Sequence, residues 1–383
     1  MRIGVVLFQY LAGKVGGTGE MIEQALPRIS GLLAAEDRLL LFGGSENLRP
    51  LRDKLTDSRE EFSRVEFIEV PLSGRGRTLL RLSDLVLPEW GTRHILKQIN
   101  EFRPDVAWYP QQSMFPVGVR CPAIVTCVDL QHQHLPENFS WAERWARYQK
   151  DRQMMLSADR IACISSATRE DLLQCHRGDP SKVGVVYLGG GGELKGGEET
   201  GVSTGGSAYV YFPANAYPHK NHVRLIRAFR EFRQEHPELK LKLVMTGQIS
   251  PPLKRELECS PMGVEHLGFV STERKEELFK GCEGVVFPSL FEGFGIPIIE
   301  AMRYGKKVLC HRLKVFEELV GDAVTYCDAR TEAGIKEGLE RWLCGVERPE
   351  VDRERYQEIV QSLTWDRFAA EMMDEFRRLG SRG

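Results

Sequence analysis

The chain has 383 residues, of which 42% are hydrophobic, and its formal net charge is -2. This length predicts two or three domains, and the balanced, scattered charge argues against a nucleic-acid-binding protein. The apolar runs fall short of the roughly 18 residues that span a bilayer, and the first strand begins without a cleavage site. Nine cysteines without a C-x-x-C pair indicate reduced thiols and no metal cluster. We therefore expect a cytoplasmic protein.

Strands alternate with helical patterns throughout the first half, which favours parallel sheets built from βαβ units. Strands are predicted at residues 3–8, 38–42, 65–70, 106–109, 123–128, 160–164 and 183–187, with helices from about residue 21 and over 89–101. Gly16 and Gly17 follow the first strand, at the sheet edge where α/β folds bind ligands. Their spacing does not match G-x-G-x-x-G, so a dinucleotide site is not indicated. Arg75, Arg77 and Arg81 suit a solvated loop better than a contact with an anionic acceptor.

Asp129 opens a polar segment, DLQHQHLPENFS, directly after a predicted strand. The alternating His132 and His134 are either substrate ligands or one surface residue and one buried residue. Further on, Ser165 lies at a strand end, and Thr168 with Asp171 fits a capping box at a helix start.

The helix predicted over residues 141–156 carries Trp141, Trp145 and Tyr148 at helical spacing. Such a stripe is typical of a face that packs into the core. Arginines and a lysine lie near its other face, which leaves a contact with a membrane surface open.

Residues 189–206 mark the predicted domain boundary, because half of this segment is glycine and should be flexible. We predict an N-terminal domain over 1–188, a linker over 189–206, a C-terminal domain over 207–363 and a final helix within 364–383. The second half shows strands at 208–212, 241–245, 264–267, 285–287 and 308–309. Lys220 lies in the loop PANAYPHKNH between the first of these strands and a helix over 223–232. A lysine there is a point charge that can meet a diphosphate.

The stretch GVVFPSLFEGFGIPIIEAMRYGKKVLC, residues 284–310, predicts a strand, a glycine turn, a helix and a second strand. Gly293 and Gly295 allow the backbone to approach a ligand closely, and the helix N-terminus offers N–H groups to a phosphate. Glu292 and Glu300 bracket this turn. Because carboxylates repel phosphate, we expect them to bind sugar hydroxyls. A phosphate beside several hydroxyls describes a nucleotide sugar.

The string from Glu292 to Glu300, with PS before it and EAM-x-x-G-x-x-V after it, resembles the E-x7-E motif of the family-4 retaining glycosyltransferases. The PHKNH loop resembles the lysine motif of that family, and the DLQH segment resembles a stretch of several of its bacterial members. The resemblance implies an α/β fold of the GT-B type. In that fold two Rossmann-like domains with parallel sheets face a central cleft, and the last helix returns to the N-terminal domain.

The resemblance also implies roles for individual residues. The donor would be bound by Lys220, His219, Glu292, Gly293, Phe294, Gly295 and Glu300, with the strand ends at Thr246, Gly247, Gly268 and Phe269 lining the nucleoside. Lys220, Glu292 and His132 would take part in catalysis. Gly16, Gly17, Asp129 and Ser165 would face the acceptor or the phosphates.

Two positions depart from the family pattern. Many relatives have a histidine where this chain has Val128, and an arginine often stands at the position of Ala214. His132 and His134 are the nearest substitutes for the first, and His219 or a distant arginine for the second.

These features predict a retaining hexosyltransferase. By analogy with polysaccharide-assembly enzymes, the best guess is transfer of mannose from GDP-mannose to a hydroxyl of a saccharide or lipid-linked saccharide. No cofactor is expected, and no metal is expected because no D-x-D motif stands at a strand end. One alternative is an inactive nucleotide-sugar-binding partner subunit, which Val128 and Ala214 would favour. A GT-B epimerase or phosphorylase ranks last.

Overall fold

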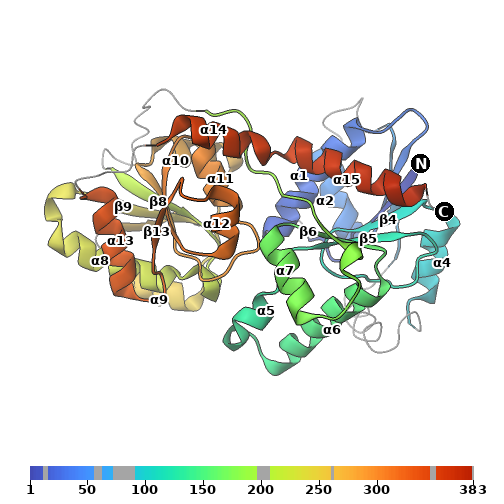
Figure 1. Ribbon diagram of the computed structural model, residues 1–383, viewed down its shortest axis with the longest axis horizontal. Helices are drawn as coiled ribbons and strands as arrows, with labels where there is room; N and C mark the ends of the chain where they lie inside the picture. Colours follow the sequence, from blue (N-terminus) through green and yellow to red (C-terminus); the bar gives the residue numbers. More distant parts are fainter. Residues whose placement is uncertain are drawn as a thin grey trace. The chain divides into compact units, whose positions relative to one another are not determined.

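The computed structural model of the chain describes residues 1–11, 16–55, 63–71, 91–195, 208–259, 263–345 and 351–381. Arg75, Arg77 and Arg81 lie outside these residues, as does the part of the predicted linker from 196 to 206. The chain divides into two compact units (Figure 1). Unit 1 comprises Met1–Gly189 and Trp365–Gly383, and unit 2 comprises Gly190–Thr364.

Unit 1 contains a parallel seven-stranded sheet in the order β3-β2-β1-β4-β5-β6-β7. Its strands are short and almost wholly apolar, as expected for a sheet covered on both faces. They are β1 Arg2–Val6, β2 Arg38–Gly43, β3 Val65–Glu69, β4 Val106–Tyr109, β5 Ala123–Cys127, β6 Arg160–Cys163 and β7 Val183–Val185.

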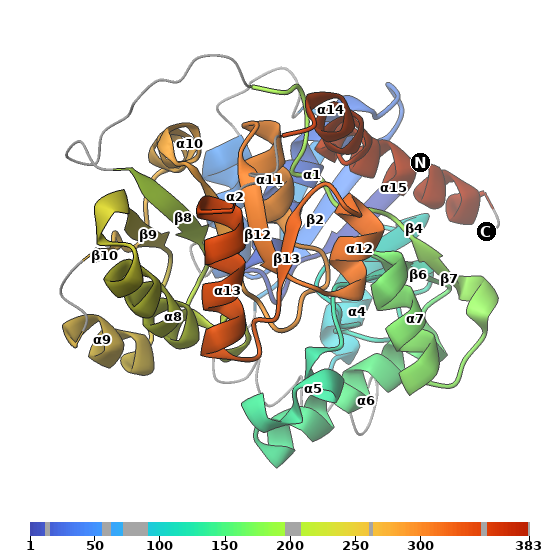
Figure 2. The same cartoon turned by 60° about the vertical axis from the view of Figure 1, so that its left-hand side comes forward.

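Helices cover both faces of this sheet (Figure 2). Those described are α1 Gly17–Gly31, α2 Ser45–Leu55, α4 Arg93–Glu101, α5 Gln131–His134, α6 Trp141–Ser157, α7 Ser166–Cys175 and α15 Trp365–Gly380. The last helix returns to unit 1, where it packs against α1 and β4. Phe376 is fully buried, with its ring centre 5.9 Å from that of Trp108. The Glu375 carboxylate receives two hydrogen bonds from Arg160, at 2.9 and 3.0 Å.

Unit 2 contains a second parallel sheet, of six strands in the order β10-β9-β8-β11-β12-β13. Its strands are β8 Tyr209–Pro213, β9 Lys242–Thr246, β10 Val264–His266, β11 Gly284–Phe287, β12 Lys307–His311 and β13 Thr325–Cys327. Its helices are α8 His222–Glu235, α9 Pro251–Glu258, α10 Thr272–Gly281, α11 Ile296–Arg303, α12 Lys314–Val320, α13 Glu332–Leu343 and α14 Arg353–Ser362. The predicted α/β class with two parallel sheets is confirmed.

Three expectations from the sequence were wrong. The stripe of Trp141, Trp145 and Tyr148 on α6 is exposed, not packed into the core. Thr168 does not start α7: Ser165 is the N-cap, and its hydroxyl accepts from the Thr168 amide at 3.1 Å.

The third concerns the glycine-rich segment, whose described part is held in place. The Gly191 amide donates to the Leu363 carbonyl and the Gly192 amide to the Val360 carbonyl, each at 2.9 Å. A Cβ on Gly191 would collide with the Val360 carbonyl oxygen, and Gly190 has a φ of 140°. The expectation of a flexible segment is therefore wrong for residues 189–195, where glycine is needed for close packing.

Candidate active site

The strand order of unit 2 predicts where a ligand binds. From β8 the chain continues outward through β9 and β10, and it then returns to β11 on the other side of β8. The connections that leave β8 and β11 therefore run in opposite directions along the sheet, and open α/β sheets usually bind a ligand in a crevice at the carboxyl ends of two such strands. Lys220 follows β8 and Glu292 follows β11.

The two residues meet at this point. The Lys220 ammonium lies 2.5 Å from Oε1 of Glu292, and only 16% and 11% of the two side chains are exposed. The same ammonium lies 5.1 Å from the ring centre of Phe287. The Leu290 amide donates to the His219 carbonyl at 2.8 Å, which ties the two loops together. The structure thus places side by side the cation and the first carboxylate that the sequence singles out.

Asn221 fixes the lysine loop, and sequence reasoning missed it. Its backbone is left-handed, with φ of 68°, a conformation that asparagine tolerates better than most residues. Its buried side-chain amide donates to the carbonyls of Pro288 and Ala329, at 3.2 and 2.7 Å. The turn-forming asparagine directly after Lys220 was a usable signal, but its two carbonyl partners are distant in sequence.

Glycine is required at the start of α11. Gly295 has φ of 103°, and a Cβ there would lie 2.6 Å from the ring of Phe316. It occupies the N-cap without any side-chain cap, next to the buried Phe294. In the first turn Pro297 has no N–H, and the Ile298 amide donates to the Gly295 carbonyl at 2.9 Å. The amides of Gly295 and Ile296 are therefore the donors that suit a phosphate at this helix start.

Glu300 lies within α11 and has a partner that the sequence did not indicate. Its Oε1 accepts from the Lys275 ammonium of α10 at 2.7 Å. Its Oε2 is buried and has no hydrogen-bond partner among the described residues. One carboxylate oxygen is therefore anchored, and the other retains its capacity to accept.

The loops after β8, β9 and β10 are bonded to one another. The Ala214 amide donates to the Thr246 carbonyl at 3.1 Å, and the Gly247 amide to the Gly268 carbonyl at 2.8 Å. Gly247 has φ of 118°, and a Cβ there would approach the Ala214 oxygen to 2.6 Å. The hydroxyl groups of Thr246 and Tyr211 are hydrogen-bonded to each other. Phe269, the residue after Gly268, is 66% exposed. These predicted donor-binding positions form one connected rim.

Two histidines of the lysine loop are held in the neutral form. Burial lowers the pKa of His219 to about 4 and that of His222 to about 3. His222 Nε2 lies 3.1 Å from the Ala214 carbonyl, to which its neutral ring donates. Burial thus favours the neutral form of His219, and its role in place of the arginine that relatives often have at the position of Ala214 stays a prediction.

In unit 1, the glycines after β1 begin α1. Gly16 is the N-cap and Gly17 the first helical residue, and a Cβ on Gly16 would meet nothing within 4 Å. Ser165 is fully buried, and its hydroxyl donates to that of Thr168 at 2.9 Å. The structure thus gives Ser165 a role in capping α7.

His132 lies inside unit 1, with 3% of its side chain exposed. Its Nε2 is 3.3 Å from Oδ2 of Asp151, and His176 Nε2 is 3.7 Å from the same oxygen. Burial lowers the pKa of His132 to about 4 and raises that of Asp151 to about 7. This position packs α5 on α6, so a catalytic role for His132 stays a prediction without a contact to support it.

Gln112 organises the neighbouring loop, and the sequence gave no indication of it. Its Oε1 accepts from the amides of Val128 and Asp129, and its Nε2 donates to the Asp129 carbonyl and to Asp151. Its φ of 45° is strained for a residue other than glycine. The position of Asp129 at the end of β5 is therefore set from the end of β4.

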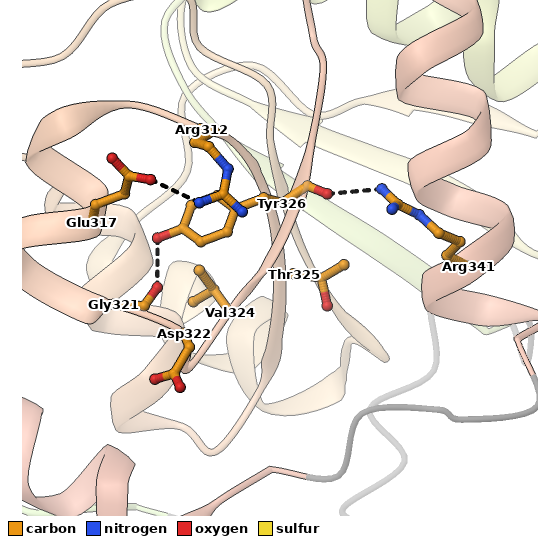
Figure 3. A pocket seen from close by; sticks show the side chains of 8 residues that line it. All are labelled: Arg312, Glu317, Gly321, Asp322, Val324, Thr325, Tyr326 and Arg341. Carbon is orange, nitrogen blue, oxygen red and sulfur yellow. Dashed lines mark hydrogen bonds and ion pairs between the residues drawn. The ribbon is translucent and has the colours of Figure 1, made fainter.

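Unit 2 has two other features that resemble sites. A hollow of about 580 Å³ lies along the edge strand β13 (Figure 3). In its lining, Arg312 stacks on the ring of Tyr326 and forms an ion pair with Glu317. Arg341 donates a hydrogen bond to the Tyr326 carbonyl. Glu235, His236 and Glu340 lie close enough together to hold a metal ion. Lys336 already lies 2.8 and 4.0 Å from the two carboxylates, so this group is charge-compensated.

Comparison with known proteins decides the family. The model of Glycosyltransferase Family 4 matches residues 55–189, and that of Glycosyl transferases group 1 matches residues 200–357. The chain belongs to the family-4 glycosyltransferases. Solved structures agree on the GT-B fold: Anabaena HepE superposes with a TM-score of 0.71 at 17% identity, covering 99% of this chain and 100% of that one. Sucrose-phosphate synthase from Thermosynechococcus elongatus gives 0.75 at 15% identity, with both chains fully covered.

Similar sequences include mannosyltransferases. The Escherichia coli O-antigen chain mannosyltransferase B is 40% identical over 65 residues, 17% of each chain. The serotype-specific mannosyltransferase WbdA of the same organism is 26% identical over 233 residues, which is 55% of this chain and 28% of the relative. The matched segments thus span well under half the length of these relatives.

Proposed function

We propose that the chain is a retaining glycosyltransferase that moves a hexose from a nucleoside-diphosphate sugar to a hydroxyl of a saccharide or lipid-linked saccharide. The observation that carries this proposal is the convergence of Lys220, Glu292 and the start of α11 at the crevice between β8 and β11. A cation and a helix N-terminus suit the diphosphate, and carboxylates suit hydroxyls.

The proposed chemistry needs charge stabilisation more than a protein nucleophile. As the glycosidic bond breaks, negative charge grows on the leaving diphosphate and the sugar gains oxocarbenium character. Lys220 and the backbone amides of Phe294 and Gly295 stabilise the diphosphate, and Glu292 holds sugar hydroxyls. The anchored Glu300 offers its Oε2 to the ribose. In this scheme Lys220 supplies the positive charge that a metal ion would otherwise bring, so we expect activity in the presence of a chelator.

Mannose from GDP-mannose is the proposed donor group, supported by the mannosyltransferases among the similar sequences. We place the activity in the cytoplasm, in keeping with nine free cysteines. Among the helices that the structure describes, none is both long and apolar enough to cross a bilayer.

The test is a thermal-shift screen of GDP-, UDP- and dTDP-sugars, followed by donor hydrolysis without acceptor. A bound donor raises the melting temperature because it binds only the native state. We expect GDP-mannose to give the largest shift and to be slowly hydrolysed, with retention at the anomeric carbon when an acceptor is added. Binding without hydrolysis or transfer would favour the inactive partner subunit, which Val128 and Ala214 suggest.

A further inference from the structure

The exposed apolar side chains of unit 1 are concentrated on α6. Of the eight large apolar residues that are exposed among those described, four belong to this helix: Trp141 at 77%, Trp145 at 39%, Tyr148 at 42% and Leu156 at 63%. Large exposed apolar groups scattered singly need no explanation, but a cluster on one element indicates a binding surface.

The spacing places these four residues on one side of the helix. The intervals between positions 141, 145, 148 and 156 are four, three and eight residues. Each is close to one or two full turns of an α-helix, so the four side chains lie on one face. The residues that α6 buries against unit 1 are Asp151, Met154 and Met155. Since α6 already has an inward face, Trp141, Trp145 and Leu156 are not required to pack the helix on unit 1. Tyr148 borders that face, with its ring centre 4.9 Å from that of His176. A complete capping box between Ser140 and Glu143 fixes where the helix begins.

The charge around the stripe is basic. Arg152 lies within the stripe and Arg144, which was expected near the other face, lies beside it; both are exposed. Arg147 is exposed on a different side of the helix, where its guanidinium stacks 4.7 Å from the ring centre of Phe139. The two acidic residues of the helix do not offset Arg144 and Arg152. Glu143 accepts hydrogen bonds from Ser140, and Asp151 is buried beside His132. The exposed side of α6 therefore combines aromatic rings with guanidinium groups.

We propose that this face of α6 docks on an anionic lipid surface. Tryptophan and tyrosine favour the boundary between acyl chains and headgroups, and arginines pair with anionic headgroups while their stems lie in the apolar layer. The stripe is one side of a single helix about 25 Å long. With a helix width of about 10 Å, that side covers about 250 Å², which is small against the roughly 800 Å² per partner that a stable protein interface buries. Figures 1 and 2 show α6 at the border of unit 1, beside α5. Such docking is separate from catalysis and would bring unit 1 to lipid-linked acceptors.

The experiment is flotation of the full chain with vesicles of phosphatidylcholine alone or mixed with phosphatidylglycerol. We expect binding to the mixed vesicles only, weakening as salt is raised. The double variant Trp141→Ala/Trp145→Ala should bind at least about 10-fold more weakly. Arg144→Gln/Arg152→Gln should lose about 30-fold, since each basic residue near an anionic surface contributes roughly a factor of five. Leu32→Ala, which removes an apolar side chain that is 43% exposed elsewhere in unit 1, is the matched control and should bind normally.

Melting temperature and donor-induced thermal shift should be the same in all variants, which keeps this test separate from that of the proposed activity. Failure of the wild type to float with anionic vesicles would overturn the proposal. Equal binding by the tryptophan double variant would do so as well. A wild-type dimer that this variant converts to a monomer would assign the face to a second copy of the chain instead.

Discussion

In the proposed mechanism Lys220 has the most direct role of any single residue. Its side chain is largely buried between Glu292 and the Phe287 ring, where a charge acts more strongly than in water. We predict that Lys220→Ala lowers turnover by about 10²-fold, the scale for losing one transition-state stabiliser. It should also weaken nucleoside-diphosphate binding in calorimetric titration. Lys254→Ala removes an exposed lysine from α9 and should leave both quantities unchanged. Normal kinetics in Lys220→Ala would sink this assignment.

The two glutamates differ in their surroundings, which the spacing alone does not reveal. Glu292 pairs with the proposed diphosphate cation, whereas Glu300 is anchored by Lys275 in α10. We predict that Glu292→Gln reduces kcat more than donor affinity, the sign of an interaction strengthened in the transition state. Glu300→Ala should mainly weaken binding of the free nucleoside diphosphate. The opposite pattern in titration and kinetics would exchange the two roles.

His222 makes stability depend on pH. Burial lowers its pKa from the ordinary 6.5 to about 3. Below pH 6.5 the unfolded chain gains a proton at this histidine that the folded chain does not, so the free energy of unfolding is unaffected above pH 6.5 and decreases as the pH falls towards 3. At pH 5 the loss is about 2 kcal/mol. The raised pKa of Asp151 acts in the opposite sense, since its unfavourable effect is relieved on acidification.

The variant His222→Gln keeps a donor for the Ala214 carbonyl and cannot gain the proton. From pH 7 to 5, the free energy of unfolding in urea should therefore fall by about 2 kcal/mol more in the wild type than in this variant. Equal losses in the two proteins would show that His222 is already accessible to protons in the native state.

At the scale of elements, the strands were predictable and several contacts were not. Most predicted strands fall within two residues of those observed, because continuous apolar runs between turn signals are characteristic of buried parallel strands. Edge strand β13, with half-buried Thr325 and Tyr326, was missed. The E-x7-E string and the lysine loop indicated which residues meet at the crevice.

What the sequence could not reveal was which side of an element is covered, and which distant groups meet. The periodicity of α6 identifies a stripe, but only the tertiary structure shows that the stripe faces outward. The links from Gln112, Asn221 and Lys275 depend on partners brought near by the fold.

The packing of 189–192 on α14 gives a prediction at this scale. A methyl group on Gly191 would meet the Val360 carbonyl, whereas one on Gly16 meets nothing within 4 Å. We predict that Gly191→Ala destabilises unit 2 by about 1–3 kcal/mol, the usual cost of overpacking. Gly16→Ala creates no collision and should cost less, at most about 1 kcal/mol, because alanine is a weaker N-cap than glycine. Urea unfolding measures both, and equal values would show that the glycine run shifts freely.

At the scale of the whole molecule, α15 belongs to a different unit from the segment that precedes it. Phe376 is fully buried in unit 1, and Phe232 is fully buried in α8 of unit 2. Each phenylalanine-to-alanine change should cost about 3–5 kcal/mol, but in its own unit. Calorimetry should show two transitions, with Phe376→Ala lowering one and Phe232→Ala the other. A single transition that both variants lower would mean that the units unfold together.

The discontinuity of unit 1 bears on how the protein is made. A ribosome completes the whole of unit 2 before it begins the helix that covers Trp108. Domains usually fold as they emerge, the first one first. Here the sheet of unit 1 is synthesised first, but its covering helix is synthesised last. The side of β4 that α15 covers therefore stays exposed while the 175 residues of unit 2 are synthesised and fold. During that interval this face of the nascent chain is the surface for which a chaperone would compete with α15.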